Sequence, residues 1–236
     1  MNLLEVENVS KRFGGLTANE DVSFTVQAGH IVGLIGPNGA GKTTMFNCVA
    51  GFFAPTAGAI KLEGRDIGGL APEACARAGV GRTFQIARTF TSMTACENVM
   101  TAAMLTEHKV GAARKTAMHW LAFANLERFA DKPAGSMTIS EQRRLAVARA
   151  LAIQPRILLM DEVMAGLNPS EVREAVDVVL KIRDRGIACL IVEHVLEGIM
   201  PIADKIVVLD RGRKIADGTP YEVSNDPQVI SAYLGD

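Results

Sequence analysis

Features of membrane-spanning and nucleic-acid-binding chains are both missing from this sequence. No uninterrupted apolar run approaches the roughly 18 to 20 residues that cross a bilayer, although 48% of the residues are hydrophobic. Lys and Arg number 25 against 26 Asp and Glu, so the formal net charge is -1. Because proteins that bind DNA or RNA by releasing counterions need a basic surface, we expect neither a membrane span nor a nucleic-acid partner.

Cysteine is also scarce. Its four copies are scattered at Cys48, Cys75, Cys96 and Cys189, with no CxxC pair and no His at zinc-ligand spacing. This usage is typical of buried, reduced thiols rather than of disulfides or a metal finger. The first residues lack a basic segment followed by an apolar stretch and a small-residue cleavage site, so we expect a cytosolic chain.

Hydrophobic spacing predicts an α/β fold with a largely parallel central sheet. Residues 31–36, 157–160 and 187–192 are continuous apolar runs, as expected for central strands covered on both faces. Near the N-terminus apolar and polar residues alternate instead, which is typical of strands with one buried face. The alternating apolar positions are Leu4, Val6, Val9, Val22, Phe24 and Val26.

Helical patterns fill much of the remaining chain. Residues 89–151 contain no strand run but have helical stretches rich in Ala, Met and Leu, which predicts a helical subdomain inserted between two halves of the α/β core. A later amphipathic helix is predicted to begin at Ser170 as its N-cap and to stop at Gly186. A hairpin with its turn at 210–212 and a short helical tail over 220–234 complete the prediction.

A glycine-rich turn follows the first apolar run and precedes a helical pattern. Its residues, from Gly36 to Thr43, fit G-x-x-x-x-G-K-[ST]. Glycines at these positions let backbone N–H groups surround a β-phosphate, and the helix N-terminus adds the positive end of its dipole. Lys42 can then reach the β- and γ-phosphates, and the Thr43 hydroxyl can ligate Mg²⁺. The strand–loop–helix context favours a nucleoside triphosphate site over a chance glycine-rich loop.

Two carboxylates follow the second apolar run, at the sheet edge where α/β folds bind ligands. Asp161 suits Mg²⁺ through a bridging water, and Glu162 can polarise a water for in-line attack on the γ-phosphate. In isolation this pair would as readily be an ordinary strand end. Together with the upstream phosphate loop, it favours hydrolysis over simple nucleotide binding.

Four smaller motifs complete a resemblance to the ATP-binding subunit of ABC transporters, and the resemblance covers essentially the whole chain. Gln85, in RTFQIARTF, stands where that family has its Q-loop glutamine, and His194, which is expected to close the strand CLIVEH, matches its switch histidine. Phe13 occupies the place of the aromatic that stacks on adenine, and residues 165–168 match the D-loop. Each motif alone is weak, since a lone Gln or His is more often a surface residue, but their order and spacing are specific.

The resemblance implies a P-loop NTPase (RecA-like) core with an N-terminal antiparallel β subdomain and an inserted α-helical subdomain. A single ABC ATPase domain would then span 1–236. Its α/β core with the β subdomain would comprise 1–88 and 152–236, and the helical subdomain with the signature motif would comprise 89–151.

The resemblance also implies ATP and Mg²⁺ as cofactors and a set of site residues. The catalytic residues would be Glu162, His194 and Gln85. The metal would be held by Thr43, Gln85 and Asp161. The nucleotide-binding residues would be Phe13, Gly36, Asn38, Gly39, Ala40, Gly41, Lys42, Thr43, Thr44, Thr138 and Ser140.

Within the family, GVGRTFQ, DEVMAGLNPSEV, VEHV and the ending GTPYEVSNDPQVISAYLG are most similar to the ATPases of branched-chain (hydrophobic) amino acid importers. Related ATPases serve urea and other amide-type substrates. In this family two subunits, identical or related, bind two ATP molecules head-to-tail and drive separate integral-membrane permease subunits, whose coupling helix would fit a groove near residues 86–105. The resemblance implies a peripheral location on the cytoplasmic face of the cell (inner) membrane, with a periplasmic or extracellular solute-binding protein as an indirect partner.

One motif departs from the family pattern. The signature LSGGQ is replaced by MTISE at residues 137–141. Thr138 keeps a hydroxyl, but Ile139 and Ser140 replace both glycines, which let a helix N-terminus approach a γ-phosphate held by the opposite subunit. A side chain at Ser140 should crowd that approach, although its hydroxyl could instead cap the helix. Two interpretations stay open: family drift with little consequence, and a weakened composite site.

Three other functions compete with import. A soluble ABC-type ATPase of a non-transport assembly scaffold, such as one for iron–sulfur clusters, is disfavoured by the import-type features around Asp161 and at the C-terminus. A DNA-repair or chromosome ATPase would carry a long coiled coil or zinc insert and a basic surface, and this sequence shows none of these features. A binding-only pseudo-ATPase is opposed by the intact Lys42, Glu162 and His194, and favoured slightly by the altered signature. Co-sedimentation with membranes and a permease would separate the scaffold function from import.

Overall fold

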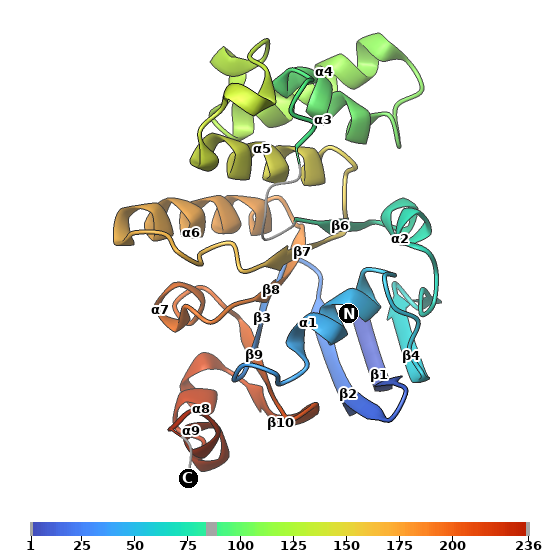
Figure 1. The fold of residues 1–236 in the computed structure, drawn as a ribbon, viewed down its shortest axis with the longest axis vertical. Coiled ribbons are helices and arrows are strands. Elements are labelled where there is room, and N and C mark those ends of the chain that lie inside the picture. Colours follow the sequence, from blue (N-terminus) through green and yellow to red (C-terminus); the bar gives the residue numbers. More distant parts are fainter. Residues whose placement is uncertain (1, 84–88, 235–236) are drawn as a thin grey trace.

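The computed structural model describes residues 2–83 and 89–234. They form two β-sheets with helices packed between and around them (Figure 1). Among the helices of these residues, none has both the length and the apolar character that crossing a membrane requires.

The N-terminal sheet is antiparallel, with the strand order β2-β1-β4-β5. The apolar positions that alternate in the sequence all lie on its buried face, and Val9, Val22 and Val26 are fully shielded from solvent. This confirms the prediction of strands with one buried face. The strands are β1 (Asn2–Phe13), β2 (Leu16–Gln27), β4 (Ala57–Leu62) and β5 (Arg65–Asp66).

The second sheet has six strands in the order β10-β9-β3-β8-β7-β6. Its members from β9 to β6 run parallel, and β10 pairs antiparallel with β9 at one edge. The three continuous apolar runs are its central strands, as predicted. The strands are β3 (Ile31–Ile35), β6 (Val80–Arg82), β7 (Ile157–Asp161), β8 (Ala188–Val192), β9 (Lys205–Asp210) and β10 (Arg213–Gly218).

Two hydrophobic cores cover the faces of this central sheet. On one face, Val32 and Leu34 of β3 pack with α1 (Lys42–Val49), which lies between the two sheets. On the other face, Ile31 and Ile35 belong to the core that the long helices cover. A strand buried on both faces must be apolar at every position, which is why these strands appear in the sequence as unbroken runs.

Residues 89–151 contain helices and no strand; their only extended pairing is an isolated bridge between Thr94 and Pro133. Their three α-helices pack on one another and lie together at one end of the molecule (Figure 1). The predicted helical character of this stretch is thus observed, whereas its status as a separate subdomain stays a prediction. The helices are α3 (Ala95–Ala103), α4 (Val110–Phe123), η1 (Glu127–Phe129), η2 (Ala134–Ser136) and α5 (Ile139–Leu151).

The amphipathic helix α6 (Pro169–Arg183) begins earlier than the sequence pattern predicted. Its N-cap is Asn168, so the choice of Ser170 was wrong. The Asn168 side chain accepts hydrogen bonds from the backbone N–H groups of Ser170 and Glu171, at 2.9 and 3.0 Å. Pro169 suits the first helical position because it has no N–H to leave unpaired. The helix ends at Arg183, just before the predicted stop at Gly186, whose φ is 80°.

The remaining helices are short. The hairpin β9–β10 turns at residues 211–212, as expected, and the tail that follows is two helices rather than one. In the second of them, Tyr233 reaches the first glycine of the phosphate loop, because the backbone of Gly36 hydrogen-bonds to its hydroxyl. The short helices are α2 (Pro72–Ala78), α7 (Leu196–Ile199), α8 (Pro220–Ser224) and α9 (Pro227–Leu234).

Candidate functional site

The glycine-rich turn connects the end of β3 to the start of α1. Gly39 and Gly41 have φ values of 79° and 95°, in the left-handed region that glycine enters without steric cost. A Cβ atom at Gly41 would lie 2.5 Å from the backbone oxygen of Ala18 and 2.5 Å from the side-chain nitrogen of Asn19. Asn19, which is fully buried, donates from that nitrogen to the Gly41 oxygen at 3.2 Å. Strand β2 therefore supports the loop from behind.

Lys42 is the first residue of α1, and its ammonium folds back over the loop. The Nζ atom donates to the backbone oxygens of Gly36 and Pro37 at 2.7 and 2.9 Å. Burial lowers the pKa of Lys42, and the negative charge of Glu162 opposes that shift. A cation is therefore held among backbone groups of the loop and within the field of the Glu162 carboxylate.

The other predicted loop residues lie on the same turn. Asn38 and Thr43 are exposed, and Thr44 is half-buried. Ala40 is buried, and its backbone oxygen accepts a hydrogen bond from Gly212 at 3.1 Å. The turn of the β9–β10 hairpin thus braces the loop, while the Thr43 hydroxyl stays accessible to a ligand.

Strand β7 ends at Asp161, and Glu162 follows immediately. Burial raises the pKa of Asp161, and the guanidinium of Arg82, whose Nη2 lies 3.6 Å from Oδ2, opposes that shift. Glu162 has a φ of 48°, and its N–H donates to the backbone oxygen of Val192 at 2.9 Å. Left-handed backbone is uncommon outside glycine and concentrates at functional sites.

His194 lies two residues beyond the end of β8, so it does not close that strand as its sequence position suggested. Its Nδ1 is 3.7 Å from Oε1 of Glu162. The structure therefore brings Lys42, Glu162 and His194 together at the carboxyl ends of β3, β7 and β8. Gln85 lies outside the described residues, as does the start of the expected groove near 86–105.

Phe13 stands apart at the end of β1. Its ring is 42% exposed and packs edge-on against Phe53, with 5.1 Å between the centroids. The ammonium of Lys11 lies 4.8 Å from the Phe13 centroid. An exposed, braced aromatic is compatible with stacking on a planar ligand, but the described contacts do not join it to the phosphate loop.

The altered signature forms the start of α5. Thr138 is its N-cap: the hydroxyl accepts from the N–H of Glu141 at 3.2 Å, and the Glu141 carboxylate accepts from the N–H of Thr138 at 2.8 Å. This capping box already satisfies the helix end, so the expectation that Ser140 could cap it was wrong. Ser140 is exposed instead, beside Ile139, whose side chain is 74% exposed.

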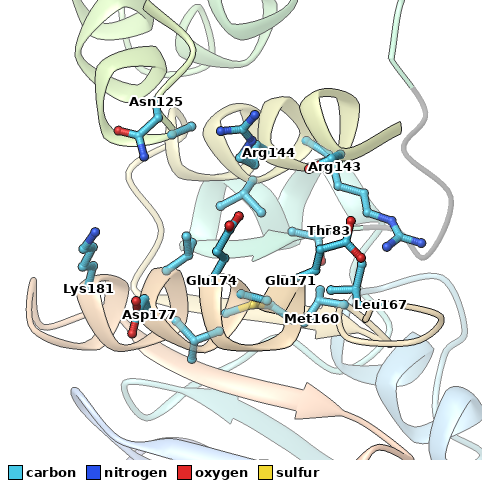
Figure 2. Close-up of a pocket in the computed structure, with 18 of the residues that line it drawn as sticks. Thr83, Asn125, Arg143, Arg144, Met160, Leu167, Glu171, Glu174, Asp177 and Lys181 are labelled. Atoms are coloured by element: carbon cyan, nitrogen blue, oxygen red, sulfur yellow. The ribbon is translucent and has the colours of Figure 1, made fainter. Parts of the chain in front are cut away.

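A cavity of about 430 Å³ lies between α5 and α6 (Figure 2). It is lined from α5 by Ser140 and Arg144, from α6 by Glu174, and from the end of β7 by Asp161 and the following Glu162. In Figure 2, Arg144 lies on α5, and Glu174 points from α6 toward that helix. Because one cavity joins the signature end of α5 to both carboxylates, it is part of the same candidate site.

Two charged residues at this site, the half-buried Arg82 and the buried Glu193, were not identified from the sequence. Arg82 donates from Nη1 to Oδ1 of Asn47 at 2.7 Å and lies over the ring of Phe46, 4.8 Å from its centroid. Glu193 has no exposed surface. Both residues could have been found in the sequence by the feature that marks Asp161, a charged residue directly at the end of an apolar strand.

Comparisons with known proteins agree with this arrangement. A profile of the ABC transporter family matches residues 19–165, and one of the branched-chain amino acid ATP-binding cassette transporter matches residues 213–236. The high-affinity branched-chain amino acid transport ATP-binding protein BraF of Pseudomonas aeruginosa is 43% identical over 99% of this chain and 98% of its own length.

Solved structures show the same fold. The ADP conformation of MJ1267, an ATP-binding cassette of an ABC transporter, covers all of both chains with a TM-score of 0.90 at 30% identity. A dimeric post-hydrolysis state of the cassette MJ0796 with ADP and phosphate gives a TM-score of 0.82 at 25% identity, over 92% of this chain and 98% of that one. With its phosphate loop, its paired carboxylates and these relatives, the chain belongs to the ABC transporter family as an ATP-hydrolysing, ATP-binding cassette.

Proposed function

We propose that this cassette is the ATP-hydrolysing motor subunit of an importer for branched-chain or related amino acids. The observation that carries the ATPase part is the convergence of Lys42, Glu162 and His194 at the carboxyl edge of one parallel sheet, where α/β folds bind ligands. The similarity to BraF over nearly the full length carries the substrate class.

We propose a separate role in ATP binding or hydrolysis for each site residue. Lys42 and the N–H groups of the loop bind the β- and γ-phosphates, and the exposed ring of Phe13 stacks on adenine. Glu162 accepts a proton from the attacking water, and His194, 3.7 Å from it, contacts the γ-phosphate. Gln85 would complete the site from the connection to the helical subdomain.

The donor set fits Mg²⁺. The exposed Thr43 hydroxyl on α1 and the Asp161 carboxylate at the end of β7 supply hard oxygen ligands. Among residues 2–83 and 89–234, no group of three or more His, Cys, Asp or Glu side chains could hold a metal alone, which suits an ion that enters with the phosphates. Bound there, Mg²⁺ would neutralise charge on the β- and γ-phosphates.

Two cassettes would act together. Ile139 and Ser140 present the start of α5 to the outside of the chain, accessible to ATP bound by a second cassette. The dimeric MJ0796 structure supports a pair of cassettes, which we propose to be head-to-tail. Each ATP would lie between the phosphate loop of one subunit and Thr138 and Ser140 of the other.

The pair would drive separate permease subunits from the cytoplasmic face of the inner membrane, with a solute-binding protein as an indirect partner. The helical residues 89–151, which we propose to be a subdomain within the single 1–236 cassette, would pass movement to the permease. The match of residues 213–236 to the branched-chain transporter profile supports the importer branch.

Purification and reconstitution test this function. The tagged chain is purified from native membranes with its co-purifying subunits and placed in proteoliposomes with the solute-binding protein. We expect ATP-dependent uptake of leucine, isoleucine or valine, which Lys42→Ala abolishes. Recovery without a permease, or ATP hydrolysis without uptake of any amino acid, would instead indicate the assembly-scaffold function.

A further inference from the structure

Glu193 is a carboxylate with no contact with solvent. It follows β8 directly and has 0% exposed surface. Its Oε1 accepts a hydrogen bond from the backbone N–H of Met164 at 2.7 Å. Its Oε2 accepts from the N–H groups of His194 and Val195 at 3.3 and 3.5 Å. A buried carboxylate is costly unless such donors compensate it, and here they are backbone groups.

The groups that Glu193 holds belong to two separate stretches of chain. Met164 lies in the segment that leads from Glu162 to α6, and His194 lies in the connection from β8 to α7. One carboxylate therefore bridges the segment that carries the proposed base and the segment that carries the proposed γ-phosphate contact. A second link between the two segments is the hydrogen bond that the Glu162 N–H donates to the backbone oxygen of Val192, at 2.9 Å.

Close packing fixes the same segment from another side. Met164 is fully buried, and its Sδ lies where a side chain on α7 would stand, because a Cβ atom at Gly198 would be 2.4 Å from it. Glu162, two residues earlier, has a φ of 48°. Such a backbone conformation persists only when its surroundings hold it.

We propose that Glu193 is a positioning residue for ATP hydrolysis: by joining the backbones of Met164, His194 and Val195, it sets the Glu162 carboxylate and the His194 imidazole relative to each other. The inference rests on the proposed roles of Glu162 and His194. Glu193 itself has no exposed surface, so it would act through these backbone groups and not on ATP directly.

The variant Glu193→Gln isolates this role because it keeps the volume but has only one acceptor oxygen. Its NH₂ group would face backbone N–H donors on one side, so either Met164 or the pair His194 and Val195 loses its partner. A displacement of about 1 Å in a catalytic group can cost about 100-fold in rate, so we expect kcat to fall about 10- to 100-fold. Lys42 and its loop do not contact Glu193, so the KM and Kd for ATP should stay within about twofold.

The experiment measures steady-state ATPase kinetics, ATP-analogue binding and thermal melting on the purified chain together with its co-purifying subunits. Glu197→Gln, an exposed residue in α7 of the same connection, is the matched control and should retain the parental kcat. Glu193→Asp keeps the charge and both oxygens but is one methylene shorter, so it should also lower kcat, and it decides the question if the Gln variant does not fold.

An unchanged kcat in Glu193→Gln would overturn the inference. So would a loss of kcat that is matched by an equal loss of ATP affinity, since that would show a purely structural role. None of these readouts depends on amino-acid uptake. Failure of amino-acid uptake with normal hydrolysis would therefore count against the importer function and not against Glu193.

Discussion

The four thiols show how burial decides the chemistry of single residues. All four cysteines are buried and free. Burial raises the pKa of Cys48 to about 11 and that of Cys189 to about 12. Because the thiolate is the reactive form, native protein should resist iodoacetamide at about pH 8, whereas protein unfolded in guanidinium should be labelled at all four positions. Mass spectrometry of both samples measures this, and rapid labelling of native Cys189 would contradict it.

The carboxylate of Glu162 is the proposed base for ATP hydrolysis. The variant Glu162→Gln removes the proposed base but leaves Lys42 and the phosphate loop intact. A positioned general base contributes about 100-fold or more to a rate, so hydrolysis should fall by at least that factor while ATP binding is kept. ATP should then trap two cassettes together, visible as a dimer in size-exclusion chromatography. Unchanged steady-state hydrolysis would refute the assignment of the base.

Elements were predictable where a local pattern specifies them. Strands buried on both faces appear as apolar runs, and the hairpin and the helical stretch over 89–151 follow from spacing and turn residues. The start of α6 was predicted wrongly at Ser170. A capping box has a Glu three residues after its N-cap, a test that Asn168 passes with Glu171 and Ser170 fails with Arg173. That test selects the observed caps of four helices: Thr94, Thr138, Asn168 and Thr219.

The altered signature can be tested at the start of α5. Ser140→Gly removes a side chain where the family has a glycine, so the helix N-terminus should approach the partner's γ-phosphate more closely. Backbone hydrogen bonds to charged groups contribute about 1.5–3 kcal/mol, and a partly restored contact should raise ATP turnover about threefold or more.

Ser170→Gly is the matched control because Ser170 occupies the same position, second in a helix with a capping box, on α6. Both variants place a glycine in a helix and should lose similar stability, but only Ser140→Gly should change turnover. Equal rates in the two variants would favour family drift without consequence.

At the scale of the whole molecule, sequence reasoning succeeded for local motifs and failed for contacts between distant segments. The phosphate loop is contiguous, so its spacing alone predicts its chemistry. The ion pair between Arg82 and Asp161 and the bond from Met164 to Glu193 depend on how the central sheet orders its strands. A charged residue after an apolar strand indicates the carboxyl edge of the sheet, where the site lies. It does not show whether the charged group binds a ligand or hydrogen-bonds to the backbone.

Pairing with a different cassette would make the two ATP sites of the assembly unequal. If this chain works with a related subunit that has an intact LSGGQ, its own Lys42 and Glu162 build the competent ATP site, because the partner's signature completes it. The second site must use this chain's residues 137–141, where side chains replace both glycines. In the assembled complex, Glu162→Gln should therefore lower ATP turnover about tenfold or more, and the equivalent change in the partner should lower it less than about twofold. ATPase rates of the two single-variant complexes measure this, and equal losses would show that both sites hydrolyse ATP alike.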